Sequence, residues 1–394
     1  MTALDIPGHQ ASTPGDHATA LLGRPGPRLD DVRRIAVLRG GGLGDLLFAS
    51  PALEALAATY PEAEIMLLGT ELHDELLSGR PGPVDSVEPL PVAEGVRERP
   101  GPQEVPLDDF VERVRGLDLD LAVQVHGGGR YSNPFLLALG ARRTIGLRTP
   151  DAAALDLEIP YRYYQHEMLR ALEVVGLVGA VPVTLEPVVR VLDRERAWGC
   201  ELRRALDGPL VVLHPGATDP RRRWPVESFA RLARGCATAG ARVVVVGDGN
   251  DVALAEEVAA RSGGAATSLA GTLTLSELVG LLSVAAVLVG NDSGPRHLAQ
   301  AVGCPTVGVY WVGNLVNAGP LTRARHRVHL GWTTVCPVCG ASQVAPGDDR
   351  CAHDPSFVSG VTVDEVVAET LDLLGRETTS SSTASHLSRN ASRP

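Results

Sequence analysis

Short apolar runs alternate with amphipathic stretches along the chain, and this alternation restarts near residue 210. The apolar runs predict buried strands, at residues 35–39, 63–68, 119–125, 143–147, 210–214, 241–246, 286–290 and 305–310. The amphipathic stretches predict helices, at residues 106–116, 166–178, 225–239 and 251–261, and a capping box at Thr274 and Glu277 opens another. This alternation predicts parallel sheets that are covered by helices on both faces.

The length of the chain, 394 residues, is too great for one ordinary core. We therefore predict two Rossmann-like, doubly wound α/β domains, at residues 31–185 and 186–375, which face each other across a cleft. The composition of segments 1–30 and 376–394 predicts a disordered extension and a disordered tail. The segment 79–101 is rich in Pro and Gly, which predicts a surface loop. Ligands of such sheets bind beyond the carboxyl ends of the strands.

Composition narrows the class of protein. The apolar content of 44% and the charged content of 21% are typical of a soluble globular protein. A net charge of −11 and an aromatic content of 4% argue against a nucleic-acid partner. No run approaches the ~20 apolar residues of a membrane span, and the first 30 residues lack a signal peptide. We expect a cytoplasmic protein whose six cysteines are mostly reduced.

A glycine-rich loop, Gly40-Gly41-Gly42-Leu43-Gly44-Asp45, follows the first strand, and Ser50-Pro51 is expected to cap a helix over residues 52–59. The loop lacks the third glycine of a dinucleotide fingerprint and carries Asp45 at its mouth. Asp45 could be a simple helix N-terminal acid. The number of glycines favours a functional loop.

The segment Gly290-Asn291-Asp292-Ser293-Gly294-Pro295-Arg296-His297 joins a strand end to a helix start. Pro295 suits the first turn of that helix. The free N–H groups and the helix dipole favour an anion there, with phosphate as the obvious candidate.

Two further loops of the second half carry charge. Arg221, Arg222 and Arg223 lie between a strand end and a helix start, where at least one guanidinium is expected to bind a diphosphate, although such a run can also be a solvated face. The loop 247–251 carries Asp251, which suits either a ribose contact or a helix N-cap.

The cysteines near the C-terminus form the pattern C-x2-C-x11-C-x-H, made by Cys336, Cys339, Cys351 and His353. Three interpretations remain open: a structural zinc site, a redox-labile pair, and the relic of a metal knuckle. In the first half, Arg130, Tyr131 and His166 suit a polyhydroxylated acceptor, or equally the anchoring of loops.

These segments together resemble glycosyltransferase family 9, the ADP-heptose:lipopolysaccharide heptosyltransferase family. The matching residues are Arg39, Gly-Leu-Gly-Asp45, Pro51, His214-Pro215-Gly216, Arg222-Arg223-Trp224-Pro225, Gly247, Asp251, Ala270-Gly271, Leu275, Asn291-Asp292-Ser293-Gly294-Pro295 and His297. They occur in family order across about residues 33–375.

The resemblance implies a metal-independent, inverting GT-B transferase that uses an ADP-sugar. It makes Asp45 the general base, on an acceptor side that includes Gly42 and Gly44. On the donor side it implies Gly216, Arg222 for diphosphate, Asp251 for ribose and the backbone of Leu273 for adenine. Asp292, Ser293, Gly294 and His297 are implied to hold diphosphate and sugar. No cofactor is implied for catalysis.

The sequence departs from the family at two of these positions. Arg222 replaces the usual lysine and Asp251 the usual glutamate. The composition, rich in Arg, Ala and Gly, suggests a GC-rich genome and a bacterium without lipopolysaccharide. The acceptor is then a glycan, a lipid-linked molecule or a natural product, and a peripheral position at the inner membrane face fits the second of these.

Three rival functions have their own signatures. A sugar-nucleotide epimerase or hydrolase of the same fold would turn over donor without acceptor. A non-catalytic nucleotide-sugar-binding protein would tolerate loss of Asp45. A Rossmann dehydrogenase is disfavoured by the missing glycine.

Overall fold

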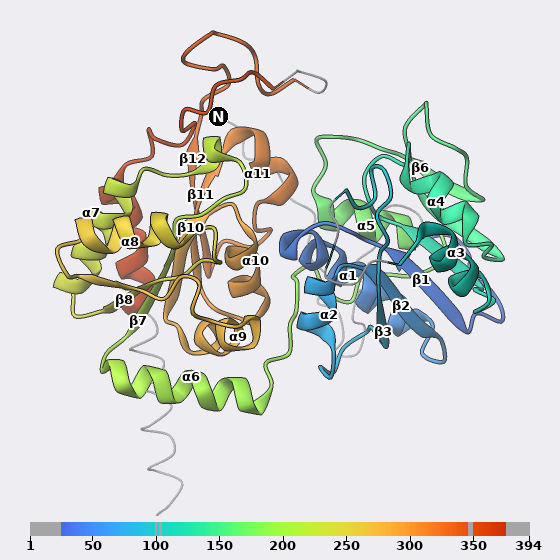
Figure 1. Ribbon diagram of the computed structural model, residues 1–394, viewed down its shortest axis with the longest axis horizontal. Coiled ribbons are helices and arrows are strands. Elements are labelled where there is room, and N and C mark those ends of the chain that lie inside the picture. The colour runs from blue at the N-terminus through green and yellow to red at the C-terminus, as the bar shows by residue number, and fades with distance from the viewer. Residues whose placement is uncertain (1–24, 99–100, 102–104, 346–349, 376–394) are drawn as a thin grey trace, which may run out of the picture.

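The computed structural model describes residues 25–98, 101, 105–345 and 350–375, and shows two six-stranded sheets (Figure 1). Within each sheet, every pair of neighbouring strands is parallel. The strand orders are β3-β2-β1-β4-β5-β6 and β12-β11-β10-β7-β8-β9. Helices flank both sheets, so the fold class is doubly wound α/β, as predicted.

The first sheet and its helices form the N-terminal half. Its strands are β1 Arg34–Leu38, β2 Glu64–Gly69, β3 Ser86–Pro89, β4 Leu121–Gln124, β5 Arg143–Arg148 and β6 Leu157–Pro160. Its helices are α1 Leu43–Thr59, α2 Glu71–Leu77, α3 Leu107–Arg115, α4 Ser132–Ala138 and α5 Glu167–Gly176.

The second sheet and its helices form the C-terminal half. Its strands are β7 Leu210–His214, β8 Arg242–Val245, β9 Ala266–Ser268, β10 Val287–Asn291, β11 Thr306–Trp311 and β12 His326–Gly331. Its helices are α6 Asp193–Leu206, the short 3-10 helix η1 Pro220–Arg222, α7 Val226–Thr238, α8 Val252–Arg261, α9 Leu275–Val284, α10 Gly294–Ala301 and α11 Val312–Ala318. Residues 363–375 are also helical.

One hydrophobic core continues from the first half into the second. Buried side chains of α1, such as Leu47, belong to the same cluster as Leu298 of α10 and Leu282 of α9. The outer faces of the two sheets have separate cores. The two halves therefore meet along α1 and α10 while each remains a layered unit. The predicted boundary at residues 185 and 186 falls between α5 and α6 and stays a prediction.

Helix α1 begins nine residues before the expected start at Ala52, so that prediction was wrong. The helix starts after Gly42, whose N–H is accepted by Asp45 at 2.9 Å. It runs through Pro51, which cannot donate to the carbonyl of Leu47. The hydroxyl of Ser50 donates to that carbonyl instead, at 2.9 Å. Ser50 thus repairs the hydrogen bond that Pro51 removes, and the helix continues.

The segment 79–101 is not a loop throughout, because it contains the strand β3 beside β2. The expectation of a surface loop was wrong there, since Pro and Gly are tolerated where they flank an edge strand. The sequence also missed the edge strands β6, β9 and β12. Residues 1–24 and 376–394 of the expected extension and tail lie outside the described residues. Among the described residues, no helix has the length and apolar character required to cross a membrane.

Candidate active site

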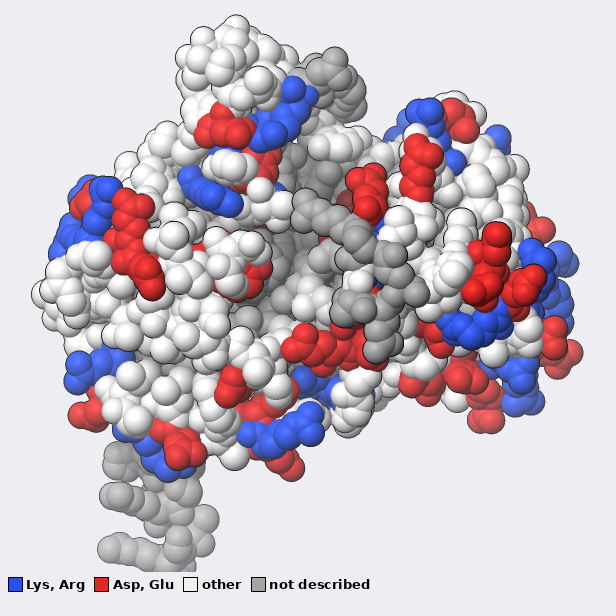
Figure 2. Space-filling view, in the orientation of Figure 1, with Lys and Arg blue, Asp and Glu red and all other residues white. Residues whose placement is uncertain are grey.

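The N-termini of two helices, one from each half, meet between the two sheets. A Cβ placed on Gly294, the first residue of α10, would lie 3.2 Å from the Cβ of Leu43 in α1. A Cβ on Gly44 would lie 3.3 Å from the ring of His297. Glycine leaves room for this approach, because a Cβ at either position would force its neighbour to shift by a few tenths of an ångström. The contact brings Gly44, Gly294 and His297 together, and Gly42 lies just before α1. The surface is hollowed between the halves (Figure 2), and both helices direct positive dipole ends there.

Asp45 lies in the first turn of α1 and is held by a buried arginine. Arg39 donates from Nη2 to Asp45 Oδ1 at 2.8 Å and from Nε to its backbone oxygen at 3.0 Å. The same guanidinium reaches Val125 O at 2.6 Å and Glu167 Oε2 at 3.2 Å. The Asp45 side chain is still 47% exposed. Its carboxylate is therefore fixed in direction and partly exposed. Asp45 also accepts from Gly42 N, so it serves as an acid of the first turn of α1 as well.

The carboxylate of Asp292 lies at the centre of a buried polar cluster at the start of α10. His297 Nε2 is 3.0 Å from Oδ1, and Oδ2 accepts from Asn314 at 2.9 Å and from Arg222 at 3.2 Å. Burial opposes ionisation of Asp292, but the hydrogen bond from His297 and the charges of Arg222 and Arg296 hold its pKa far below the ordinary value. Asp292 is thus an anion that positions Arg222 beside the α10 N-terminus.

The tautomer of His297 follows from its two neighbours. Arg296 donates to Nδ1, so that nitrogen must accept and Nε2 must carry the proton that Asp292 accepts. Burial and the charge of Arg296 lower the pKa of His297 to about 4. The ring is therefore neutral at pH 7. It stacks edge-on with Phe48 of α1 at 4.5 Å between centroids, which joins the two halves.

A second polar chain links Ser293, His214 and Asp251. The Ser293 hydroxyl is 2.9 Å from His214 Nδ1, and His214 Nε2 is 3.4 Å from Asp251 Oδ2. The hydrogen bond from His214 holds the pKa of Asp251 below its ordinary value. Asp251 precedes α8 but makes no side-chain cap hydrogen bond. A Cβ on Gly216 would lie 2.4 Å from the Asp251 carboxylate, so Gly216 leaves the space that this side chain occupies.

The predicted acceptor residues separate into two groups. Arg130 and Tyr131 line an open pocket of ≈ 290 Å³ beyond β4, and Arg130 lies 5.2 Å over the Tyr131 ring and 3.7 Å from Asp151. His166 is buried at the start of α5: Nδ1 accepts from Met168 N, and Nε2 donates to Gly319 O at 2.7 Å. His166 therefore connects the halves, and its contact with an acceptor stays a prediction.

The family model for glycosyltransferase family 9 (heptosyltransferase) matches residues 111–336, more than half of the chain. The chain belongs to glycosyltransferase family 9. Lipopolysaccharide heptosyltransferase 2 of Salmonella typhimurium is 25% identical over 377 residues, which cover 87% of this chain and 99% of that protein. The chain is accordingly a glycosyltransferase, as the motifs predicted.

Two solved structures show the same fold. ADP-heptose lipopolysaccharide heptosyltransferase II of Escherichia coli has a TM-score of 0.67 at 22% identity, over 88% of this chain and all (100%) of that one. An E. coli heptosyltransferase with ADP-2-deoxy-2-fluoro heptose has a TM-score of 0.59 at 18% identity, over 75% and 92%. The two sheets of this family 9 chain therefore adopt the GT-B arrangement.

The family 9 motifs account for only part of the site. Sequence reasoning missed the roles of Arg39 and Asn314, which hold the two carboxylates, and of Glu167, which shares Arg39 with Asp45. Arg39 and His214 stand in the matched motifs, so the sequence already indicated that they lie near the site. Asn314 and Glu167 lie in helices with no distinctive local pattern, and only the fold brings them here. Leu273 lies between β9 and α9, and its adenine contact stays a prediction.

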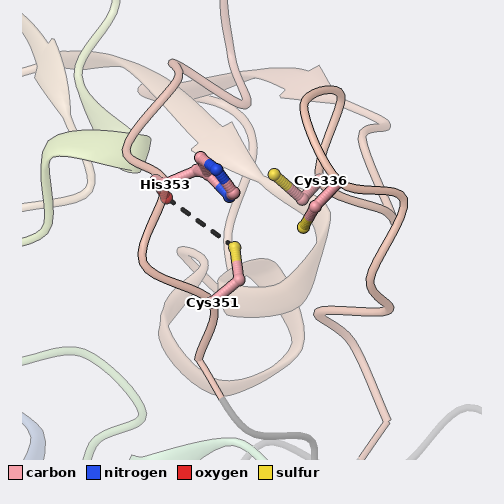
Figure 3. Close-up of side chains that lie close together, drawn as sticks. Cys336, Cys351 and His353 are labelled. Carbon is pink, nitrogen blue, oxygen red and sulfur yellow. Dashed lines mark hydrogen bonds between the residues drawn. The ribbon is translucent and has the colours of Figure 1, made fainter.

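A separate cluster of possible metal ligands lies after β12. One ligand atom from each of Cys336, Cys339, Cys351 and His353 lies within 4.8 Å of the others. In Figure 3 the side chains of Cys336, Cys351 and His353 come from two loops and gather in one place. This arrangement could hold a metal ion, as the cysteine spacing indicated.

Proposed function

We propose that this family 9 glycosyltransferase transfers heptose from ADP-heptose to a hydroxyl group of its acceptor. The relative from S. typhimurium is named as a lipopolysaccharide heptosyltransferase, and the E. coli structures are named for ADP-heptose or hold its fluorinated analogue. The observation that carries the proposal is the meeting of α1 and α10. This contact brings the first turn of α1, which carries Asp45, beside a helix N-terminus suited to a phosphate.

The chemistry is a single displacement with inversion. The acceptor oxygen attacks the anomeric carbon as its proton passes to Asp45, and the bond from that carbon to the diphosphate oxygen breaks. ADP leaves with the electron pair. Arg39 acts as a positioning residue, since it directs the Asp45 carboxylate while it is itself fixed by Val125 and Glu167.

The donor side stabilises the charge that grows on the leaving diphosphate. Arg222, steered by Asp292, supplies a guanidinium, and the N–H groups of Ser293 and Gly294 supply the helix N-terminus. Asp251 is placed to accept from ribose hydroxyls, as the resemblance implies, with the backbone of Leu273 for adenine. These donor groups, together with His297, need no divalent ion for the diphosphate, so we propose transfer without a catalytic metal.

The acceptor class is proposed to be a glycan, a lipid-linked molecule or a small natural product. The pocket lined by Arg130 and Tyr131 lies beyond the carboxyl end of β4, in the half that also carries Asp45. On the face in Figure 2 basic side chains are interspersed with acidic ones, which suits a neutral or polar acceptor better than nucleic acid. We propose that the reaction takes place in the cytoplasm, where nucleotide-sugars are made.

The test measures ADP released from ADP-heptose with and without acceptors of these three classes. Asp45→Asn and Asp45→Ala should lower transfer by about a hundredfold or more while ADP affinity is retained, because a general base contributes on this scale. Glu75→Gln, an exposed carboxylate of α2, is the matched control and should not change the rate.

The outcomes separate the rivals. Donor consumption without acceptor would support the hydrolase or epimerase, and binding without turnover would support the binding protein. Near-normal transfer by Asp45→Asn would remove Asp45 from the chemistry. A transfer rate that depends wholly on added Mg²⁺ or Mn²⁺ would contradict the metal-free step.

A further inference from the structure

We propose that Cys336, Cys339, Cys351 and His353 bind one tetrahedral divalent ion of the zinc or ferrous type, and that this ion braces the loop that presents Arg222 to the diphosphate. The second half of this inference rests on the proposed function, whereas the first half stands on the cluster alone.

The four ligand atoms already have nearly the spacing that a tetrahedral ion needs. Metal–sulfur bonds of about 2.3 Å and metal–nitrogen bonds of about 2.0 Å require ligand atoms about 3.3–3.8 Å apart. All four atoms lie within 4.8 Å of one another. A contraction of about an ångström would complete the site, and three thiolates with one imidazole are a ligand set that selects zinc or iron over magnesium and calcium.

The His353 ring carries an independent sign of a missing ligand. Its Nδ1 atom is buried and has no hydrogen-bond partner. A buried ring nitrogen without a partner is costly, and a metal ion would satisfy it directly or fix the ring through Nε2. The neighbouring thiol of Cys351 turns toward the carbonyl of His353, 3.8 Å away (Figure 3), so both side chains face the same space.

The first two cysteines lie on a tight turn that presents both sulfurs to one point. Cys336 N donates to Ala341 O and Gly340 N donates to Cys336 O, each at 2.8 Å. Gly340 has φ of +74°, which favours glycine directly after Cys339. The backbone N–H groups of Cys339 and Val338 are also directed at the Cys336 sulfur. The turn therefore holds both sulfurs on the same side, toward Cys351 and His353.

The segment that carries the cluster also holds the diphosphate loop. Gln343 accepts from Arg221 Nη1 at 2.6 Å, and Ser356 Oγ donates to Arg223 O at 2.6 Å. Phe357 N donates to Arg221 O at 2.8 Å. Arg222 lies between the two residues that are held in this way. In Figure 1 the segment after β12 projects above the C-terminal sheet.

Arg221 makes the closest link between the loop that carries Arg222 and the segment that carries the cysteine cluster. Its guanidinium is bound by Asp219 at 2.6 Å and lies over the rings of Trp311 and Phe357, at 5.8 and 5.4 Å. It therefore points away from the donor and into the segment that follows β12. An ion that joins the loop of Cys336 to the loop of Cys351 would fix Gln343 on one side of this contact and Ser356 on the other.

The first experiment asks whether the ion exists. The full chain, purified without chelator, should contain about one zinc or iron ion per molecule by elemental mass spectrometry, which tells the two metals apart. Replacement by Co²⁺ should give the charge-transfer and d–d absorption bands of a tetrahedral thiolate site. Cys339→Ser should lose most of the metal, and Cys200→Ser, which changes a half-buried cysteine of α6, should retain it.

The second experiment asks whether the ion supports the donor loop. Calorimetric titration with ADP should show affinity about tenfold weaker in the metal-free protein, and restored by the metal. Gln343→Ala should keep its metal and still bind ADP more weakly, which general unfolding would not produce. Acceptor KM should stay unchanged.

A chain that contains no metal and gives no Co²⁺ spectrum would overturn the site, as would a disulfide between these cysteines in the active protein. A bound metal with equal ADP affinity in the loaded and metal-free states would overturn the link to the donor loop. Failure of the metal-loaded wild type to bind ADP would overturn the proposed function and the link together, while the metal content still decides the site.

Discussion

Removal of the Arg222 guanidinium is the most direct test of the donor site. Arg222 Nη1 lies 3.2 Å from Asp292 Oδ2 and the side chain is 22% exposed, so most of its N–H groups remain for a ligand. A charge-assisted hydrogen bond contributes about 1.5–3 kcal/mol. Arg222→Ala should therefore weaken ADP binding by about 10–150-fold. Transfer should slow as well, because the contact strengthens as the leaving group gains charge.

The assay is calorimetric titration of ADP together with the rate of transfer. Arg222→Lys should be milder, since the charge remains although the planar fork is lost. Arg231→Ala is the matched control: this arginine pairs with Asp364 on the exposed surface of α7 and should change affinity little. The variant should stay folded, because Asp292 retains His297 and Asn314 as partners. Equal ADP affinity and equal transfer in Arg222→Ala and wild type would refute the assignment.

Two other predictions concern buried polar groups of the C-terminal half. Gly216→Ala places a Cβ 2.4 Å from the Asp251 carboxylate and should weaken ADP binding by about tenfold. Gly249→Ala, whose Cβ would have no atom within 4 Å, is the control and should not change ADP affinity. Equal ADP affinity in Gly216→Ala and wild type would argue against a contact between Asp251 and the ribose. The folded-state pKa values of His297 and His326 are lowered to about 4. The unfolded chain therefore takes up protons first below about pH 6.5. Stability is complete above that pH and is lost toward pH 4, by up to about 2 kcal/mol for each histidine at pH 5. Urea unfolding at pH 7 and pH 5 measures this, and a stability unchanged between them would contradict it.

The sequence predicted the parts of the fold that local pattern determines. The central strands β1, β2, β4, β5, β7, β8, β10 and β11 were expected because they are largely apolar runs, as strands buried on both faces must be. The edge strands β6, β9 and β12 were missed, because polar residues interrupt their apolar runs. The start of α1 was wrong since Pro51 looked like a first-turn residue, and the compensating hydroxyl of Ser50 can be recognised only once the helix is seen.

The candidate site, too, could be predicted only where a local sequence pattern marks its residues. Asp45, Asp292 and Gly294 were singled out as candidates because they stand in motifs at strand ends. His166 suited either an acceptor contact or the anchoring of loops, and both of its nitrogens bind backbone atoms, one of them in the other half, while the acceptor contact stays a prediction. Nothing in a local window distinguishes a histidine that joins two domains from one that binds a sugar. The roles of such residues depend on contacts between distant segments, which periodicity does not report.

The meeting of two helix N-termini poses an electrostatic problem that the two carboxylates solve. Both helix ends are partly positive, so their approach is unfavourable unless anions lie between them. Asp45 on α1 and Asp292 beside α10 supply that charge when the site holds no donor. An incoming diphosphate would compete with Asp292 for Arg222. Asp292 can release part of that contact at low cost, because His297 and Asn314 continue to hold it. Asp45 differs from Asp292, since its side chain is 47% exposed while Arg39 binds Oδ1 and the N–H of Gly42 binds Oδ2. In the proposed mechanism, the buried carboxylate of Asp292 holds a cation for the donor, and the partly exposed carboxylate of Asp45 takes a proton from the acceptor.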